Sequence, residues 1–479
     1  MSVLNSEFMS DSITEIVPEV ARVSKNLAAS SVLTGRRRVR IVPQNGQSFV
    51  ASTSGSSAMI NWLISDGAAF MDPTSAVLSF SLTTRDASSA PVAGTEVVLD
   101  DGAWSAFTRL LISVNSTLVD DIDQLPKKVN SQLYPTVSQS WYDSVGSFCG
   151  LWKMSNTAFK GAATDKYNVA ARRTAYAAAI QNGTSAAALA NGKNNFMIPL
   201  SLLSGFFASE QLLPLPHLGQ LQLSLSLADA LSACVASIPG ATPGFRIDDV
   251  SIECDFVEVH PTYGALIAKL CREDEGIMVP YQASLVSSQD IPASAGGNSS
   301  YNIVFSKATP NLRAITTFQQ SKAGLSSAAY PKTSTFCNNG YYSVQYRIGS
   351  LYYPAMPSVN EARAFADLQS AFGRPGNSLE TSGLCDANNY YLTTTVAGDG
   401  TLSGNPADLF LHAISFDKLK GARFGAGGVD LDGVNTMQAS GAQVVIQLVA
   451  ANTQASVVGA VINYTRVLRI RQGAISIVG

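Results

Sequence analysis

Short runs in which apolar and polar residues alternate recur along the chain from about residue 41 onward. In Leu221–Leu227, four leucines alternate with Gln222, Ser224 and Ser226. Successive side chains of a strand point to opposite faces, so this run predicts one apolar and one polar face. Many such runs separated by turn residues predict a β-sandwich. Further runs are Ala76–Thr84, Leu110–Val119, Val250–Val259, Ile303–Phe305, Tyr341–Ile348, Val444–Val449 and Ser456–Ile470.

Two segments have the spacing of helices instead. Apolar residues between Ile13 and Leu27 recur at helical spacing, which predicts an N-terminal helix that begins near Pro18. The second helix is predicted over Ser358–Phe372, where Ser358 and Glu361 have the spacing of a capping box. These helices interrupt an otherwise β-rich chain.

Four arginines follow the N-terminal helix and end a predicted arm over residues 1–40. They are Arg36, Arg37, Arg38 and Arg40. Two interpretations stand. The arm contacts membrane, nucleic acid or a neighbouring subunit on the inner face of an assembly, or it is a solvated, partly disordered terminus.

The 479-residue chain is long enough for two or three domains, and it is poor in charge. Charged residues make up 14% of it, against about 25% in typical soluble proteins. A surface of neutral polar residues suits burial against neighbours, because few ions lose their hydration. It equally suits a secreted β-protein with a Ser/Thr-rich exterior. The net charge of −3 argues against a nucleic-acid-binding role for the whole chain.

The six cysteines show no CxxC pair, and we interpret them as reduced core thiols. No signal peptide and no apolar run of membrane-spanning length is visible. The three histidines have no metal-ligand spacing, and no P-loop or nucleophile elbow is present. We therefore expect no enzymatic activity, cofactor or metal.

Two residue clusters leave alternatives open. Asp100 and Asp101, with Asp120, Asp121 and Asp123, either gather around a cation at a strand end or are solvated turn acids, which we favour. A group of tyrosines either forms a sugar- or partner-binding face or packs half-buried with a solvated hydroxyl, which we again favour. These tyrosines are Tyr341, Tyr342, Tyr346, Tyr352 and Tyr353.

The most informative segment links two strands through a proline corner. It begins with Ile198, Pro199 and Leu200, passes through Leu213, Pro214 and Leu215, and ends in the alternating Leu221–Leu227 run. This order resembles the "IPL … LPL" signature of double jelly-roll major capsid proteins of the adenovirus and large DNA virus lineage. Three further segments resemble the same family in the same order within residues 65–270. They are Met71–Leu82, Leu110–Tyr134 and Phe245–Leu270.

The resemblance implies an all-β fold of two tandem eight-stranded jelly-roll sandwiches, with short helices in loops and a helical N-terminal arm. The charge cluster Arg272–Glu275 suggests a boundary, which gives an arm over 1–40, a first jelly roll over 41–270 and a second over 271–479.

The implied function is that of a major capsid protein in the shell of a virion. Two jelly rolls approximate a third of a hexagon, so homotrimers would form pseudo-hexagonal capsomers that tile an icosahedral shell. Implied partners are neighbouring capsomers, a pentameric vertex protein, minor or cement proteins, and an internal membrane or genome contacted through the arm. The alternatives are a secreted or surface carbohydrate-binding or lyase-type β-sandwich, and two tandem single jelly rolls that form separate towers.

Overall fold

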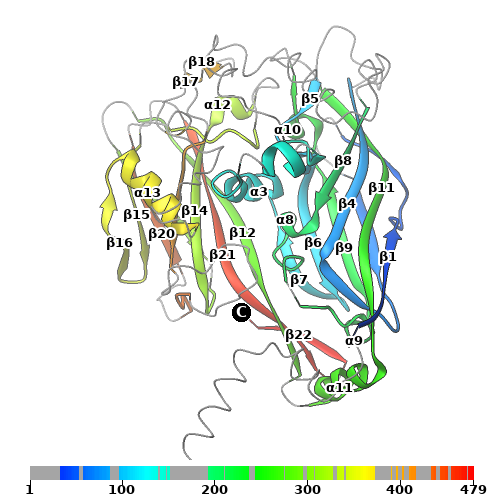
Figure 1. The fold of residues 1–479 in the computed structure, drawn as a ribbon. Helices are drawn as coiled ribbons and strands as arrows, with labels where there is room; N and C mark the ends of the chain where they lie inside the picture. The colour runs from blue at the N-terminus through cyan, green and yellow to red at the C-terminus, as the bar shows by residue number, and fades with distance from the viewer. Residues whose placement is uncertain are drawn as a thin grey trace, which may run out of the picture.

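A computed structural model shows two β-sandwiches standing side by side (Figure 1). It describes residues 33–52, 58–86, 97–138, 141–146, 148–151, 193–209, 211–236, 243–273, 276–294, 299–306, 308–326, 332–338, 341–372, 390, 395–396, 402–403, 409–416, 433–437, 443–450, 455–471 and 473–478. The predicted N-terminal helix lies outside these residues.

The first sandwich consists of two antiparallel four-stranded sheets. One sheet has the order β1-β11-β4-β8, with the short β2 also paired to β11, and the other has the order β3-β9-β6-β7. In chain order the strands, β2 aside, cross between the two sheets at every connection except the β6–β7 hairpin, as in a jelly roll. Their bounds are β1 Leu33–Ile41, β2 Ser48–Val50, β3 Met59–Ile64, β4 Phe70–Asp86, β6 Phe107–Val114, β7 Thr117–Ile122, β8 Lys193–Pro199, β9 Leu221–Leu227 and β11 Pro243–Val259.

The second sandwich repeats this strand order. Its sheets are β12-β21-β14-β19, with β22 paired to β21, and β13-β20-β15-β16. The predicted double jelly roll is therefore confirmed, and β12, β21 and β16 occupy the places that β1, β11 and β7 occupy in the first sandwich. The bounds are β12 Ile277–Ile291, β13 Ser299–Ser306, β14 Leu312–Ser321, β15 Tyr341–Ile348, β16 Leu351–Ser358, β19 Leu411–Ser415, β20 Gln443–Ala450, β21 Ser456–Arg471 and β22 Ala474–Val478.

Short elements occupy the connections. The strand pairs β5–β10 and β17–β18 form two small sheets. The bounds are β5 Val97–Leu99, β10 Cys234–Ala236, β17 Thr395–Val396, β18 Leu402–Ser403, η1 Ala103–Ala106, η2 Tyr142–Gly146, α3 Leu125–Leu133, α8 Leu200–Leu203, α9 Leu215–Leu218, α10 Ala230–Ala233, α11 Pro261–Arg272, α12 Lys322–Leu325 and α13 Glu361–Ala371.

The alternation in β9 produces the apolar interior of the first sandwich. All four leucines of Leu221–Leu227 are fully buried, while Gln222 is exposed. The neighbouring strands β6 and β7 form a hairpin whose turn residues, Asn115 and Ser116, both have positive φ angles. This is the conformation that a two-residue turn needs to match the twist of its strands. The five described cysteines are buried free thiols, as predicted.

Two predictions about secondary-structure elements differ from the structure. Residues 33–40, which we assigned to an arm, belong to β1 and pair with β11 in the first sheet. The capping box predicted at Ser358 is wrong, because α13 begins later. Asn360 caps this helix by accepting a hydrogen bond from the Arg363 amide, while the Ser358 hydroxyl donates to Asp367.

The last strand of the first sandwich ends at residue 259 and the first strand of the second begins at residue 277. Helix α11 occupies most of the connection, and the boundary we proposed after residue 270 falls near its end. His260 caps α11 by accepting a hydrogen bond from the Thr262 amide, and Pro261 occupies its first turn.

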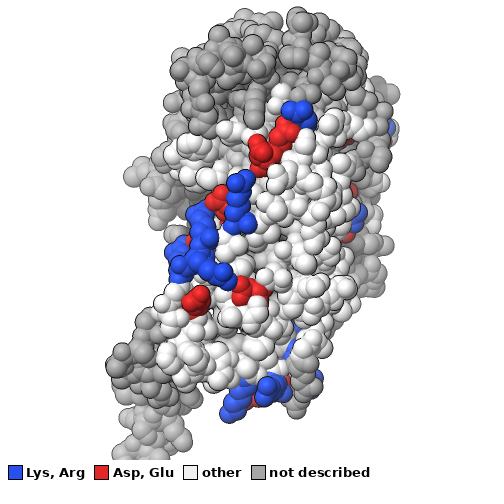
Figure 2. All heavy atoms as spheres, turned by 90° about the vertical axis from the view of Figure 1, so that its right-hand side faces the viewer, with Lys and Arg blue, Asp and Glu red and all other residues white. Residues whose placement is uncertain are grey.

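The outer side of the sheet β1-β11-β4-β8 carries its charged side chains on β1 and β11, where Arg36 pairs with Asp255 and Arg38 pairs with Glu253. Figure 2 shows this side of the molecule, with a diagonal band of charged side chains and a separate group of Lys and Arg side chains near its lower end. On β4, Leu78 and Phe80 are buried in the core, so the alternating Val77, Ser79 and Ser81 face outward. The outer side of β4 is thus neutral, whereas the neighbouring β11 and β1 carry ion pairs.

Candidate structural site at the junction of the two sandwiches

The signature segment belongs to the first sandwich, and the loop inside it reaches the second sandwich. Ile198 and Pro199 end β8, Leu200 begins α8, and Leu213 pairs with Met71 through two backbone hydrogen bonds of 2.9 Å. The apolar members of the signature are buried to within 1% exposure, so their packing fixes the path of the loop that they enclose. The apolar signature residues are thus part of the core. They are Ile198, Leu200, Leu213 and Leu215.

The loop after α8 contacts the second sandwich directly. Gly205 lies so close to Gln282 on β12 that an added Cβ would be 2.3 Å from the Gln282 carbonyl oxygen. Next to it, the buried ring of Phe206 packs edge-on against Tyr281, with ring centroids 5.6 Å apart. Only glycine permits this approach of two backbones. The sequence therefore places the smallest residue at the tightest point of the junction.

Strand β7 of the first sandwich is bound from the second sandwich by two hydrogen bonds to one carbonyl group. The Val119 carbonyl accepts from the Tyr281 hydroxyl at 2.7 Å and from Nη1 of Arg466 at 3.0 Å. Nearby, Nε2 of Gln132 on α3 donates to Oδ1 of Asn463 on β21 at 2.8 Å. These bonds fix β7 and α3 against β12 and β21.

A buried carboxylate lies next to these bonds. Asp120 is 1% exposed and accepts a 2.6 Å hydrogen bond from the Ser204 hydroxyl. Burial raises the pKa of Asp120 to about 6, and the Ser204 bond and the charge of Lys128 oppose this rise. Lys128 donates to the carbonyls of Leu202 and Leu203, and burial lowers its pKa to about 8.

A second buried carboxylate joins the sandwiches at another level. Asp100 of the first sandwich accepts hydrogen bonds from the Thr333 amide at 2.6 Å, from the Thr333 hydroxyl at 2.8 Å and from the Ser334 hydroxyl. Asn130 on α3 donates to the Thr333 carbonyl at 2.9 Å and accepts from the Trp104 ring at 2.8 Å. Buried charge is costly unless it is hydrogen-bonded, and these donors compensate it.

The favoured interpretation of the aspartate cluster as solvated turn acids is wrong for three of its members. Asp100, Asp101 and Asp120 are at most 1% exposed, and Asp101 accepts a 2.8 Å hydrogen bond from Tyr134. Asp121 instead pairs with Arg109 at 2.6 Å on the surface. Among the described residues, no group of three or more His, Cys, Asp or Glu side chains is arranged to hold a metal ion.

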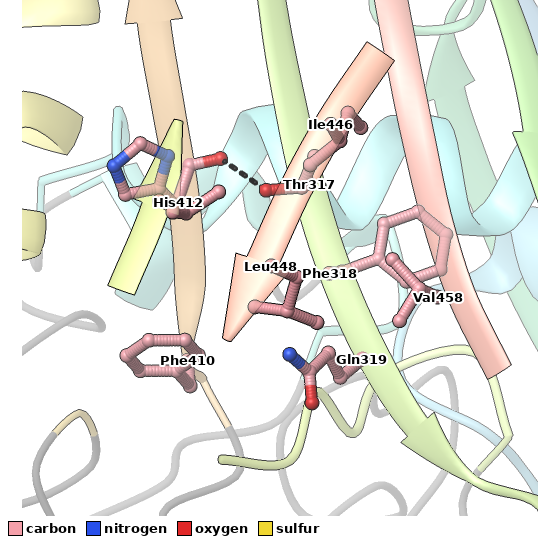
Figure 3. Close-up of a pocket in the computed structure, with 9 residues that line it drawn as sticks. Thr317, Phe318, Gln319, Phe410, His412, Ile446, Leu448 and Val458 are labelled. Carbon is pink, nitrogen blue, oxygen red and sulfur yellow. Dashed lines mark hydrogen bonds between the residues drawn. The ribbon is translucent and has the colours of Figure 1, made fainter. Parts of the chain in front are cut away.

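A small cavity lies between the sheets of the second sandwich (Figure 3). Its volume is about 10 Å³, room for at most one water molecule. His412 contributes to its wall and is buried, with Nδ1 2.7 Å from the Tyr346 hydroxyl and Nε2 3.6 Å from Asp367. Burial lowers the pKa of His412. The cavity is too small for a substrate, and these side chains form part of the core.

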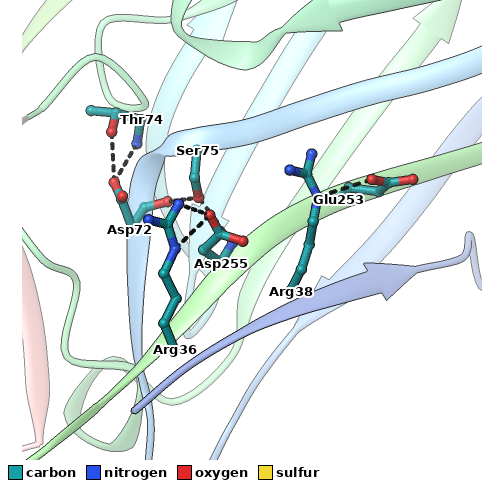
Figure 4. Close-up of polar contacts among 7 residues, drawn as sticks. All are labelled: Arg36, Arg38, Asp72, Thr74, Ser75, Glu253 and Asp255. Carbon is teal, nitrogen blue, oxygen red and sulfur yellow. Dashed lines mark hydrogen bonds and ion pairs between the residues drawn. The ribbon is translucent and has the colours of Figure 1, made fainter. Parts of the chain in front are cut away.

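The arginines of the predicted arm lie on β1 at the edge of the first sandwich (Figure 4). Arg36 pairs with Asp255, and Arg38 pairs with Glu253 at 3.0 Å, both across to β11. Arg37 points to the other side of the strand, where it pairs with Asp66. Arg40 is exposed, and its contact with an inner partner stays a prediction.

The members of the tyrosine cluster differ in burial. Tyr346 is buried, and Tyr353 is half-buried with its ring edge-on to Phe416. Tyr342 and Tyr352 are 53% and 44% exposed.

No helix in the described part of the chain has the length and apolar character needed to cross a bilayer.

Strand order, layer stacking and the buried junction together define a double jelly-roll protein with its two sandwiches fixed to each other. Several solved structures that match this fold come from viruses. VP54 of PBCV-1, fitted into a reconstruction of the virophage Sputnik, matches with a TM-score of 0.52 and 13% identity, over 94% of this chain and 98% of that chain. A chain of the Sputnik virophage structure matches with a TM-score of 0.54 and 12% identity, over 94% and 89%.

A chain of the quasi-atomic model of the PBCV-1 capsid matches with a TM-score of 0.50 and 13% identity, over 94% of this chain and 98% of that chain. No family model matches the sequence, and no curated protein matches it. The predicted resemblance to double jelly-roll major capsid proteins is thus confirmed at the level of the fold.

Proposed function

We propose that this protein is a major capsid protein whose homotrimers form pseudo-hexagonal capsomers of an icosahedral virus shell. The observation that supports this most is the buried junction that joins two jelly rolls of one strand order. Each sandwich presents a similar outline, so one chain supplies two of the six sides of a hexagon and three chains supply all six. The similar folds in the PBCV-1 capsid and the Sputnik virophage support the same assignment.

The chemistry of the junction suits this role. A subunit that tiles a shell must hold a constant angle between its halves, because an error in that angle accumulates around the ring. Three residues lie at separate points of the junction. Gly205 contacts Gln282 of the second sandwich, and Asp100 accepts hydrogen bonds from Thr333. Asp120 accepts a hydrogen bond from Ser204, in the loop that contacts the second sandwich. Packed interfaces with satisfied buried polar groups resist deformation.

We further propose that the role is structural and not enzymatic, and that the protein resides in the virion. Neighbouring capsomers are the expected partners, with a vertex protein, minor capsid proteins and an inner membrane or the genome as finer proposals. The N-terminal segment before β1 remains the proposed contact for the inner partners. Its deletion should leave trimers intact while reducing the yield of closed shells on expression with the other shell proteins.

Electron microscopy of the purified protein in negative stain tests the capsomer directly. We expect particles with a six-cornered outline and a three-fold average. Monodisperse single subunits at concentrations of about 10 mg/ml would contradict the proposal, and they would favour a β-sandwich that acts as a monomer.

A further inference from the structure

A ring of hydrogen bonds crosses the core of the second sandwich and passes through His412. His412 on β19 and Thr317 on β14 lie opposite each other in one sheet, and Tyr346 on β15 belongs to the other sheet. Nδ1 of His412 lies 2.7 Å from the Tyr346 hydroxyl, which lies 3.0 Å from Oγ1 of Thr317. The Thr317 hydroxyl donates to the His412 carbonyl at 3.2 Å and closes the ring (Figure 3). The two sheets are thus linked through one titratable side chain.

These three contacts determine which nitrogen of His412 carries the proton at neutral pH. The Thr317 hydroxyl uses its only proton on the His412 carbonyl, so Tyr346 is the donor in its contact with Thr317. Tyr346 then has no proton left for His412, and Nδ1 of His412 must donate to the Tyr346 oxygen. A neutral imidazole carries one proton, so Nε2 carries none. The tautomer is assigned from this hydrogen-bond network.

The unprotonated Nε2 faces a carboxylate. It is buried, has no hydrogen-bond partner among the described residues and lies 3.6 Å from Oδ2 of Asp367 on α13, which packs on β19. The same Oδ2 accepts a hydrogen bond from the hydroxyl of Ser358, the last residue of β16. A charge-assisted N–H···O bond is about 2.7–2.9 Å long, so a proton on Nε2 would draw Asp367 closer to β19.

Of the described charged side chains, Asp367 is the one that faces the His412 ring. Its side chain is 27% exposed, so it also offers solvent protons a path to Nε2. Arg363 lies one turn earlier on α13 and favours the ionised form of Asp367. The other side chains around the ring come from β14, β15 and β20 and are uncharged at neutral pH. They are Thr317, Gln319, Val344, Tyr346, Ile446 and Leu448.

We propose that His412 is an acid sensor inside the second sandwich. On acidification, a proton from solvent passes through the Asp367 carboxylate to the lone pair of Nε2, so no covalent bond breaks except the one to the proton in transit. The resulting imidazolium pairs with Asp367, which moves away from Ser358 toward β19 and carries α13 with it. The end of β16 thereby loses its link to α13. The sensor is a property of the folded chain and does not rest on the homotrimer.

Burial sets the direction of the effect on stability. Burial lowers the pKa of His412 below its ordinary value of 6.5, and Asp367 opposes this shift only in part. Burial also disfavours the charge of Asp367, but its hydrogen bonds with His412 and Ser358 hold its pKa below the usual range, so it is ionised when His412 titrates. The unfolded chain therefore binds the proton on His412 more readily than the folded protein does. The stability that neutral His412 contributes is lost as the pH falls from 6.5 through the lower folded-state pKa.

NMR of protein labelled at its histidine rings tests the sensor, because the chain has three histidines in all. His217→Gln and His260→Gln, both at partly buried positions, assign the His412 signals by elimination. The ring nitrogen shifts should show an unprotonated Nε2 at pH 7 and a titration below the ordinary histidine range. The opposite tautomer at pH 7, a titration like that of a free histidine, or a ring that stays neutral down to pH 4 would overturn the proposal.

Two matched variants isolate the role of Asp367. Asp367→Asn keeps the shape of the side chain but removes the charge that faces Nε2, and we expect His412 to bind its proton about tenfold more weakly. Asp290→Asn removes a carboxylate that is 59% exposed and paired with Lys322, and it should leave the titration of His412 unchanged. An unchanged titration in Asp367→Asn would overturn the pairing of the imidazolium with Asp367.

Hydrogen exchange measures the movement of α13. Between pH 7 and pH 5, after correction for intrinsic exchange rates, amides of α13 and of the end of β16 should lose protection. Amides of β9 in the first sandwich should keep theirs, and the loss should be absent in His412→Gln. Protection of α13 that is equal at both pH values in the wild type, or a loss that persists in His412→Gln, would contradict the release of β16.

Discussion

The internal junction and the outer faces of this molecule are built from different chemistry. The junction buries the carboxylates of Asp100 and Asp120, and both accept hydrogen bonds. The Thr333 amide, from across the interface, donates to Asp100, and the Ser204 hydroxyl, from the loop after α8, donates to Asp120. The outer faces present neutral residues, balanced ion pairs and the apolar hairpin β15–β16. Buried, fully bonded carboxylates suit a contact that forms once, during folding. Neutral surfaces suit a contact that forms later between soluble subunits, because few ions must lose their hydration.

The largest effect is expected where the two backbones approach most closely. Gly205→Val would place its Cβ within 2.3 Å of the Gln282 carbonyl oxygen, so one sandwich must shift. We expect a loss of about 3 kcal/mol or more in the free energy of unfolding, measured by chemical denaturation. Gly67→Val is the control, because no atom lies within 4 Å of its added Cβ. Equal stability of the two variants would show that the junction is not tightly packed.

Removal of a junction carboxylate should be nearly as damaging. Asp100→Ala deletes the acceptor for Thr333 and Ser334 and leaves buried donors without partners, at a cost of about 3 kcal/mol. Asp290→Ala removes a carboxylate that is 59% exposed and paired only with the exposed Lys322, so we expect a change within about 0.5 kcal/mol. Thermal denaturation of both variants measures the difference. A small effect for Asp100→Ala would mean that water replaces its partners.

Asp120 makes the stability of the junction depend on pH. Its folded-state pKa of about 6 lies above the ordinary value of 3.8, so the folded protein binds the proton more readily than the unfolded chain. The contribution of Asp120 to stability therefore rises as the pH falls from 7 toward 4. Asp120→Asn cannot titrate, and its stability relative to wild type should be highest at pH 7 and decline toward pH 4.

Denaturation curves at pH 7, 6 and 5 measure this difference. His412, whose burial lowers its pKa, titrates in both proteins and cancels from the comparison. A stability of Asp120→Asn relative to wild type that is constant with pH, or that increases on acidification, would contradict the raised pKa of Asp120.

The sequence was sufficient for the parts of this structure that local patterns determine. The leucines of β9 alternate strictly, so their burial could be predicted, and the Ile198–Leu200 and Leu213–Leu215 segments indicated the jelly-roll lineage. The junction could not be predicted in this way. Asp100 and Thr333 are 233 positions apart, and Asp120 and Ser204 are 84 apart, so no local spacing marks their hydrogen bonds.

The apolar hairpin illustrates the same limit. The tyrosine cluster was visible in the sequence, but a strand pattern assigns its side chains to two faces without stating which face has a neighbour. Only the sheet order shows that β16 is an edge strand, with Tyr346 buried and Tyr352 exposed. Residues 33–40 were predicted as part of an arm and not as β1 for a related reason. The pairing partner of β1, strand β11, lies more than 200 residues away in the sequence.

The central claim is that subunits associate through neutral surfaces, and the solution mass at low and high salt tests it most directly. Light scattering in 0.1 M and 1 M NaCl should give three times 50.4 kDa, about 151 kDa, in both, because salt screens exposed charge but not apolar contact. This is the smallest effect we predict, a change in mass close to zero. Trimers that dissociate to 50.4 kDa in 1 M salt, or a monomer in both buffers, would contradict the account.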